Sequence, residues 1–258
     1  MKKLLTSLAL VLLVSAATFA QTRYTIVAYH KLQPGKSIDD AIAIEKQWLQ
    51  LHDARKAAGV IEGWAMYVPY NNMKSPGIDY DYITVNSGPD LDKLHTYPME
   101  IFASMIKADP TGYEKLSAAT AKTQTILRHS FGKKVVGTAK STNKDHFVVF
   151  DMMKVADGAA YEAFEQKVVK VQEERVAVGN ISGWSFYKTI FPTSDDVAFN
   201  YSTVQSYDNL SKIDQAMDSY YKAIPKALGI SPEEFVKQAS AKRSITSTMI
   251  TKVALSTK

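Results

Sequence analysis

Bulky hydrophobic residues stand side by side in the segments that the sequence predicts as strands. Ile26 is followed by Val27, and the same kind of pair occurs at Phe186 and Tyr187. Successive side chains of a strand point to opposite faces of a sheet, so a sheet with one face in water shows alternating apolar and polar residues. The paired hydrophobic residues therefore predict strands that are covered on both faces.

The predicted elements occur twice in the same order. The first series is a strand at 24–30, a helix within 38–51, strands at 64–68 and 80–85, a second helical region and a strand at 125–136. The second series is a strand at 146–152, a helix within 161–171, strands at 184–187 and 199–204, a second helical region and a strand at 245–255. Apolar residues at three- and four-residue steps predict the helices, and β-branched and aromatic runs predict the strands. The order β-α-β-β-α-β predicts two ferredoxin-like units, each with one antiparallel sheet and both helices on one face.

The ends of the predicted helices carry recognisable signals. Each first helix has a basic residue near its last turn, Arg55 or Arg175, where a cation suits the negative end of the helix dipole. Capping boxes at 111–114 and 231–234 predict helix starts. The carboxylates of the first helices are expected to be solvated: Asp39, Asp40, Glu45, Glu162, Glu165, Glu173 and Glu174.

The two series are also similar in sequence. Residues 55–67 match residues 175–187 at seven of thirteen positions with an offset of 120, and residues 82–87 match residues 201–206 at an offset of 119. This self-similarity predicts a tandem duplication. We expect one unit at 22–136 and another at 146–258, joined by a polar linker at 137–145.

The first twenty residues have the layout of a secretory signal peptide. Lys2 and Lys3 precede an apolar run at 4–14 and small residues at 15–20, and the run is too short for a spanning helix. We expect a signal peptide at 1–20 with cleavage after Ala20, a periplasmic or secreted product, and no stable membrane insertion after cleavage. An uncleaved N-terminal anchor is the alternative.

Composition excludes several classes of protein. The 258 residues are 46% hydrophobic and 22% charged, contain no cysteine, and carry a formal net charge of +5. The lack of cysteine excludes disulfides and thiolate metal sites. Basic residues are scattered among acidic ones, so no nucleic-acid partner is expected.

The double order of elements, with Gly63-Trp64 and Gly183-Trp184 leading into the second strand of each unit, resembles the dimeric α/β-barrel superfamily. That superfamily includes the antibiotic-biosynthesis-monooxygenase, stress-responsive barrel and NIPSNAP-type families. The resemblance implies an α+β fold in which two ferredoxin-like units pack sheet to sheet within one chain. It does not name a reaction, because one fold hosts many functions.

Four aromatic residues recur in both units: Trp64, Tyr67, Trp184 and Tyr187. They could line a cleft between the sheets and stack on a flat ligand. They could also be large core residues that close the barrel. Because both copies keep them, the core interpretation is favoured.

Three histidines are not preserved by the repeat: His30 falls opposite Met153, His52 opposite Gln172, and His129 opposite Met249. If the first strand of the unit lies beside its fourth, His30 and His129 come close together. Such a pair could be half of a metal site or a proton-transfer couple. No carboxylate or third histidine stands at ligand spacing, so no metal site is predicted. Two unrelated histidines are the favoured alternative.

The favoured functional hypothesis is an exported, non-catalytic binding protein whose cavity between the sheets holds a small apolar or aromatic molecule. The chain has no set of residues typical of a known catalytic motif, and no cofactor is predicted. The superfamily resemblance implies a different class, a cofactor-free oxygenase or a haem-handling enzyme, for which His30 and His129 are the support. A purely structural or partner-binding role is the third hypothesis.

Overall fold

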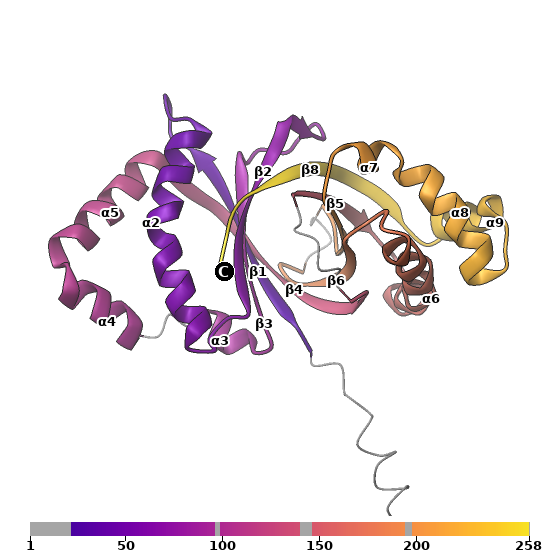
Figure 1. Cartoon of the computed structure of the whole chain (residues 1–258), viewed down its shortest axis with the longest axis horizontal. Helices are drawn as coiled ribbons and strands as arrows, with labels where there is room; N and C mark the ends of the chain where they lie inside the picture. Colours follow the sequence, from indigo (N-terminus) through magenta and orange to yellow (C-terminus); the bar gives the residue numbers. More distant parts are fainter. Residues whose placement is uncertain (1–21, 96–98, 140–145, 194–197, 258) are drawn as a thin grey trace, which may run out of the picture.

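The strands of the protein close on themselves to form one barrel (Figure 1). The computed structural model describes residues 22–95, 99–139, 146–193 and 198–257. The expected signal peptide at 1–20 and most of the expected linker lie outside these residues. Within the described chain, eight antiparallel strands follow one another in the order β1-β3-β2-β8-β5-β7-β6-β4, and β4 pairs with β1 again.

The strands are β1 (Tyr24–Leu32), β2 (Gly63–Lys74), β3 (Tyr82–Gly88), β4 (Gln124–Gly137), β5 (Phe147–Lys154), β6 (Gly183–Phe191), β7 (Tyr201–Tyr207) and β8 (Ser244–Ser256). The helices are α2 (Ile38–Ala57), α3 (Leu91–His95), α4 (Met99–Ala108), α5 (Pro110–Thr123), α6 (Gly158–Ala177), α7 (Ser211–Asp214), α8 (Ala216–Leu228) and α9 (Pro232–Ser240). The helices of the two halves lie on opposite sides of the barrel (Figure 1). No helix in the described residues is both long enough and apolar enough to cross a membrane.

The two halves have the same strand arrangement. In the first half the order is β4-β1-β3-β2, and in the second half it is β8-β5-β7-β6. The edge strands of one half pair with those of the other, β2 with β8 and β4 with β6. The two halves therefore form one closed wall, in which none of the described strands has an edge open to another chain.

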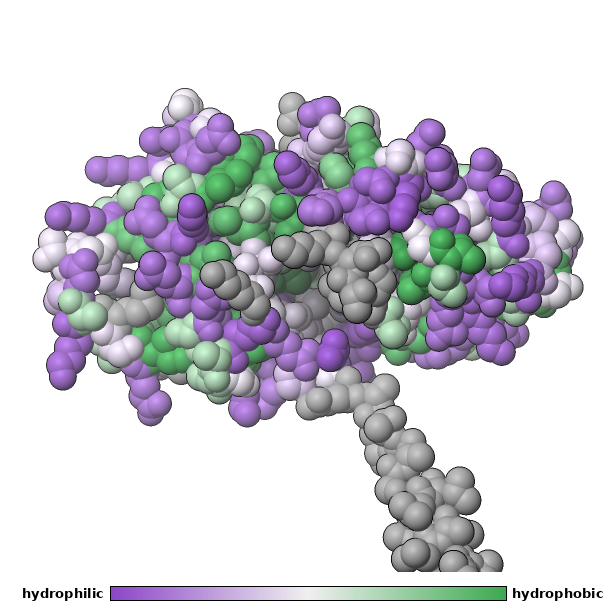
Figure 2. Space-filling view, in the orientation of Figure 1, coloured by the Kyte–Doolittle hydropathy of each residue, from purple (hydrophilic) through white to green (hydrophobic). Residues whose placement is uncertain are grey.

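Neighbouring residues of each strand point alternately into the barrel and towards the helices. Val27 and Tyr67 belong to the cluster inside the barrel, whereas Ile26 and Met66 belong to the cluster under the first-half helices. Both faces of the strands are covered, as the adjacent hydrophobic residues predict. Hydrophilic side chains cover much of the outer surface, while apolar ones gather beside α2 (Figure 2).

Of the two predicted capping boxes, the one at 231–234 caps its helix, whereas the helix expected to start at 111–114 is capped by a different residue. Helix α9 begins after Ser231, whose Oγ accepts from the Glu234 backbone N–H at 3.2 Å, within the predicted box. Helix α5 begins one residue before the predicted box. Its cap is Asp109, whose Oδ1 accepts from the Gly112 N–H at 2.8 Å, with Pro110 in the first turn. The carboxylate was the stronger cap because it accepts that N–H with a full negative charge.

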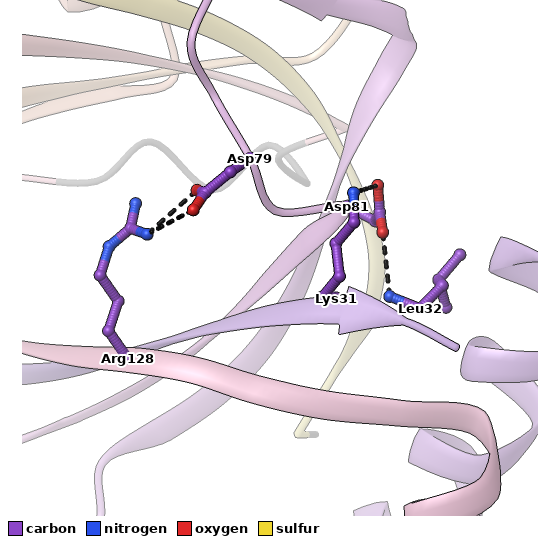
Figure 3. A network of polar contacts seen from close by, with 5 residues as sticks. All are labelled: Lys31, Leu32, Asp79, Asp81 and Arg128. Atoms are coloured by element: carbon purple, nitrogen blue, oxygen red, sulfur yellow. Dashed lines mark hydrogen bonds and ion pairs between the residues drawn. The ribbon is translucent and has the colours of Figure 1, made fainter. Parts of the chain in front are cut away.

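Carboxylates fix the segment before β3 to the ends of β1 and β4 (Figure 3). Asp81 accepts from Lys31 Nζ at 3.2 Å and from the Leu32 N–H at 2.9 Å, while Asp79 accepts from Arg128 Nη1 at 3.0 Å. Such exposed pairs contribute little to stability. Their effect is positional, because they hold the end of β1 from which His30 projects.

The closed barrel predicts that interior side chains are far less tolerant of truncation than exposed side chains on the barrel strands. Ile83 is 2% exposed inside the barrel, and Ile245 is 54% exposed on β8. We expect Ile83→Ala to lower the free energy of unfolding by about 2–5 kcal/mol and the control Ile245→Ala by less than about 0.5 kcal/mol. Urea titrations followed by circular dichroism measure both, and equal losses would contradict a packed barrel interior.

Candidate functional site

The interior of the barrel is almost filled by side chains. A space of about 100 Å³ remains there, bordered by Tyr29, Tyr67, Phe150 and Tyr187 among others. Ligand pockets usually measure roughly 300–1,000 Å³. Tyr67 and Tyr187 therefore contribute to the barrel core, and the Tyr67 ring stands edge-on to Phe150 with centroids 5.3 Å apart.

A wider space of about 1020 Å³ opens at one mouth of the barrel. Its wall includes all four recurring aromatic residues: Trp64, Tyr67, Trp184 and Tyr187. The wall also includes Ala139 and His146, which adjoin residues outside the described part of the chain, so the space does not define an enclosed site. Among the described residues, neither His30 nor His129 contributes to it. This space therefore brings the four aromatic residues together without these two histidines.

Two pockets of ligand size lie outside the barrel, between its wall and the helices. The first pocket, about 370 Å³, lies in the first half between α2, α5 and the outer face of β1, β3 and β4. The second pocket, about 530 Å³, lies in the second half between α6, α8, α9 and the outer face of the barrel. Each half thus has one pocket at a corresponding place.

The two tryptophans belong to these outer pockets. Trp64 lines the first pocket and Trp184 the second. The ring of His52 lies parallel to that of Trp64, with centroids 4.6 Å apart and planes 7° apart. Both tryptophans are also largely buried, so they are core residues and pocket walls at once.

The strand pairing brings His30 and His129 to the first pocket. Strand β1 pairs with β4, where Ala28 lies opposite His129 and His30 lies opposite Ile126. His30 is 4% exposed, its Nε2 lies 3.0 Å from Thr84 Oγ1, and its ring stacks on Tyr82. His129 is exposed at the pocket rim.

The strand register changes the expected equivalence of His129. In the first half, Ala28 pairs with Thr84 on one side and His129 on the other. In the second half, Asp151 pairs in the same way with Thr203 and Thr248. His129 is therefore equivalent to Thr248, and the expected match to Met249 is wrong by one residue. The offset changes from 120 to 119 between blocks, and sequence comparison alone could not place the change.

Two arginines that the sequence places at helix ends are in fact fully buried. Arg55 is 0% exposed and Arg175 is 1% exposed, so neither is a surface cation at a helix terminus. Arg55 lies 3.3 Å from His52 Nδ1 and donates to Asn86 Oδ1 at 3.0 Å. A buried guanidinium needs such partners because leaving water is costly for a charge.

Arg175 has the corresponding set of partners in the second half. Its Nη1 donates to Gln172 Oε1 at 2.8 Å and to Gln205 Oε1 at 3.0 Å. Gln172 corresponds to His52 and Gln205 to Asn86. The sequence signal that could have found these arginines is their identity in both repeats together with a polar partner three residues earlier.

Two carboxylates expected to be solvated are also buried. Glu45 Oε1 accepts from Tyr82 Oη at 3.0 Å and from Gln124 Nε2 at 2.8 Å, and Glu165 bonds to Tyr161. Burial raises the pKa of both carboxyl groups. The expectation failed because α2 and α6 are covered by further helices, so more than one stripe of each is hidden. Glu45 lines the first pocket and Glu165 the second.

The environment of His52 fixes its protonation. Burial, and then the positive charge of Arg55, lower the pKa of His52 to about 3. The guanidinium can only donate, so the neutral His52 accepts at Nδ1 and carries its proton at Nε2. No described residue accepts from that Nε2–H, and His52 lines the first pocket. The pocket therefore offers a neutral N–H donor that is polarised from behind by a buried cation.

Comparison with known proteins bears on the fold. No family model and no curated protein matches the chain. Among solved structures, a proposed monooxygenase from Fusobacterium nucleatum subsp. nucleatum is 11% identical, with a TM-score of 0.55 over 93% of this chain and 96% of that one. An anthrone oxidase-like protein is 9% identical, with a TM-score of 0.51 over 92% and 93%. The protein therefore shares its overall fold with these two structures.

Burial of His30 and His52 predicts a pH-dependent stability. Burial lowers the pKa of each from 6.5 to about 3, so below about pH 6.5 the unfolded chain binds protons that the folded chain does not. The contribution of each histidine to stability is then complete above about pH 6.5 and is lost as the pH drops towards 3, by up to about 1.4 kcal/mol per pH unit. We expect His30→Met, which installs the residue of the second half, to reduce this slope.

Urea unfolding of both proteins between pH 6.5 and 5 measures the slope over the range in which the histidine contribution rises from about half to nearly all of its maximum. An unchanged slope in the variant would show that His30 takes up its proton in the folded protein.

Proposed function

We propose that the protein is a cofactor-free oxygenase of the dimeric α/β-barrel type and that its active site is the first pocket. The substrate class is a planar, fused-ring aromatic molecule with a phenol or enol hydroxyl. The observation that carries the proposal is the neutral His52 Nε2–H donor with Arg55 behind it. The fold likeness to a proposed monooxygenase and to an anthrone oxidase-like protein supports the reaction class.

The first pocket has the parts that oxygenation without a cofactor requires. The keto form of such a molecule reacts with O₂ after its ring methylene has lost a proton, because the resulting enolate is the electron donor. Glu45, whose pKa is raised by burial, is placed to take that proton. His52 donates to the oxyanion that results, and Trp64 gives the ring a flat wall.

The helix sets the distance between these groups. Glu45 and His52 are seven residues apart on α2 and so share one face, about 10 Å apart along the axis. That separation favours a fused-ring substrate over a single ring. For a ring methylene the reaction balances as CH₂ + O₂ → C=O + H₂O, in which the substrate supplies all the electrons.

The other activity implied by the superfamily resemblance, a haem-handling enzyme, fits the described residues poorly. A haem ligand has to direct a ring nitrogen into the cavity that holds the macrocycle. His30 has its Nε2 on Thr84 and its ring on Tyr82. The Nε2 of His52 carries the proton and so has no lone pair to offer iron, while His129 is exposed at the pocket rim. The second pocket has no histidine among its described lining residues. We derive no step through haem.

The proposal also includes three expectations from the sequence: the duplicated units, the export of the protein and the class of ligand. The shared strand order supports two ferredoxin-like units that arose by duplication, of the antibiotic-biosynthesis-monooxygenase type, and the layout of residues 1–20 supports export to the periplasm or beyond. The ligand remains a small aromatic molecule. Its place moves from the barrel interior to the first pocket.

Replacing His52 tests the proposed oxyanion donor. With anthrone as the probe substrate, we expect His52→Phe to lower kcat/KM for oxygen uptake by about a hundredfold, because the ring stays against Trp64 but the N–H is lost. His52→Gln should restore part of the rate, since an amide can accept from Arg55 and donate to the ligand. An oxygen electrode measures the rates.

The matched control is Trp184→Phe, which alters the corresponding wall of the second pocket and should leave the rate unchanged. Absence of anthrone-dependent oxygen uptake by the wild type, or equal rates in the wild type and His52→Phe, would contradict the proposal.

A further inference from the structure

The second pocket differs from the first in charge. Strand pairing aligns Gln124, at the start of β4, with Arg243, just before β8. Gln124 bonds to Glu45, and Arg243 lies 3.8 Å from Glu165, so both residues stand beside the corresponding buried carboxylate. The change from glutamine to arginine gives the second pocket a cation that the first pocket does not have at this place.

Arg243 is held in place by one end of its guanidinium. Nη1 lies 3.0 Å from Tyr161 Oη and 3.0 Å from Met153 Sδ, and Cζ lies above the Tyr161 ring. Within the described residues, no side chain accepts from Nε or Nη2, and the side chain is 21% exposed on the pocket wall. One edge of a fixed guanidinium thus remains for a ligand, and this is the geometry that suits a carboxylate.

The acidic groups of the second pocket are already engaged. Asp151 accepts from Thr248 Oγ1 at 2.7 Å and from Gln205 Nε2 at 3.3 Å, and Glu165 accepts from Tyr161. Arg175, by contrast, is buried among neutral acceptors within the described chain, which do not cancel its charge. Among the described residues, Asp151 also accepts only from neutral donors, so its negative charge offsets one of the two guanidiniums. Because burial raises the pKa of Glu165, the other guanidinium is not fully balanced and favours an anion over a cation in this pocket.

The remaining wall of the second pocket is aromatic. Trp184, Tyr220 and Phe235 line it, and Tyr220 and Phe235 meet edge-on at 5.5 Å between centroids. Aromatic walls of this kind bind flat rings by contact with the ring face or edge. A volume of about 530 Å³ accommodates a fused-ring molecule.

We propose that the second pocket is a separate binding site for a planar aromatic carboxylate. The ligand carboxylate binds the Nε and Nη2 edge of Arg243, and its rings lie against Trp184 and Tyr220. This site does not depend on the oxygen chemistry assigned to the first pocket, and its test does not use that activity.

The test compares an aromatic anion with its neutral analogue. 2-Naphthoate and 2-naphthamide are titrated into the full chain by calorimetry. We expect 2-naphthoate to bind at least about tenfold more tightly, and Arg243→Gln, which installs the residue of the first half, to abolish this preference. The control Lys237→Gln removes an exposed cation of the same half that does not line the pocket, and should leave the preference intact.

Two further variants locate the binding and guard against misfolding. In Trp48→Phe/Trp64→Phe the chain keeps Trp184 as its single tryptophan, and 2-naphthoate should quench its fluorescence. Glu165→Gln/Arg243→Gln removes both charges of the pair, so a loss of preference in this variant, with a native circular dichroism spectrum, excludes an unpaired buried carboxylate as the cause. Equal affinity for the two probes, an unchanged preference in Arg243→Gln, or no quenching of Trp184 would overturn the proposal.

Discussion

The pairing of β2 with β8 and of β4 with β6 is the constraint on which the rest of the structure depends. Each half alone would present two open edges and one bare sheet face to water. Closure pairs the edges and turns the bare faces into a shared interior, which side chains fill almost completely. Because the interior is used for packing, two spaces of ligand size lie on the helix side of the wall, and a third opens at the barrel mouth.

Burial of two arginines follows from the same arrangement. Helices α2 and α6 lie against the outer face of the barrel, and Arg55 and Arg175 reach from their last turns into the layer between helix and strand. Polar residues of the neighbouring strand, Asn86 and Gln205, receive them there. Each half therefore has a buried positive charge near its pocket. Arg175 lines the second pocket directly, whereas His52 stands between Arg55 and the first pocket.

Element order and strand placement could be predicted from the sequence, because adjacent hydrophobic residues and three- to four-residue periodicity report directly on local geometry. The repeat also pointed to Trp64, Trp184 and the unmatched His30. The burial of Arg55 and Glu45 was not predicted, although the identity of Arg55 and Arg175 in both repeats was a signal for the arginines. A charged residue on a helix is normally solvated, and only the covering helices, which are distant in sequence, reverse that expectation. A cavity was expected inside the barrel for a similar reason, because the way side chains distant in sequence fill the interior cannot be read from local patterns.

The two pockets show how a repeated framework acquires different chemistry through a few side chains. The shared framework is a tryptophan wall, a buried glutamate and a buried arginine. Histidine at position 52 converts the charge of Arg55 into a neutral N–H donor, which suits an oxyanion that forms during a reaction. In the second half, Gln172 replaces this histidine and accepts from Arg175 instead. Arg243 adds a full positive charge, which suits a ligand that is already an anion when it binds. The first arrangement favours catalysis and the second favours binding, because only a donor matched to a developing charge stabilises a transition state more than a ground state.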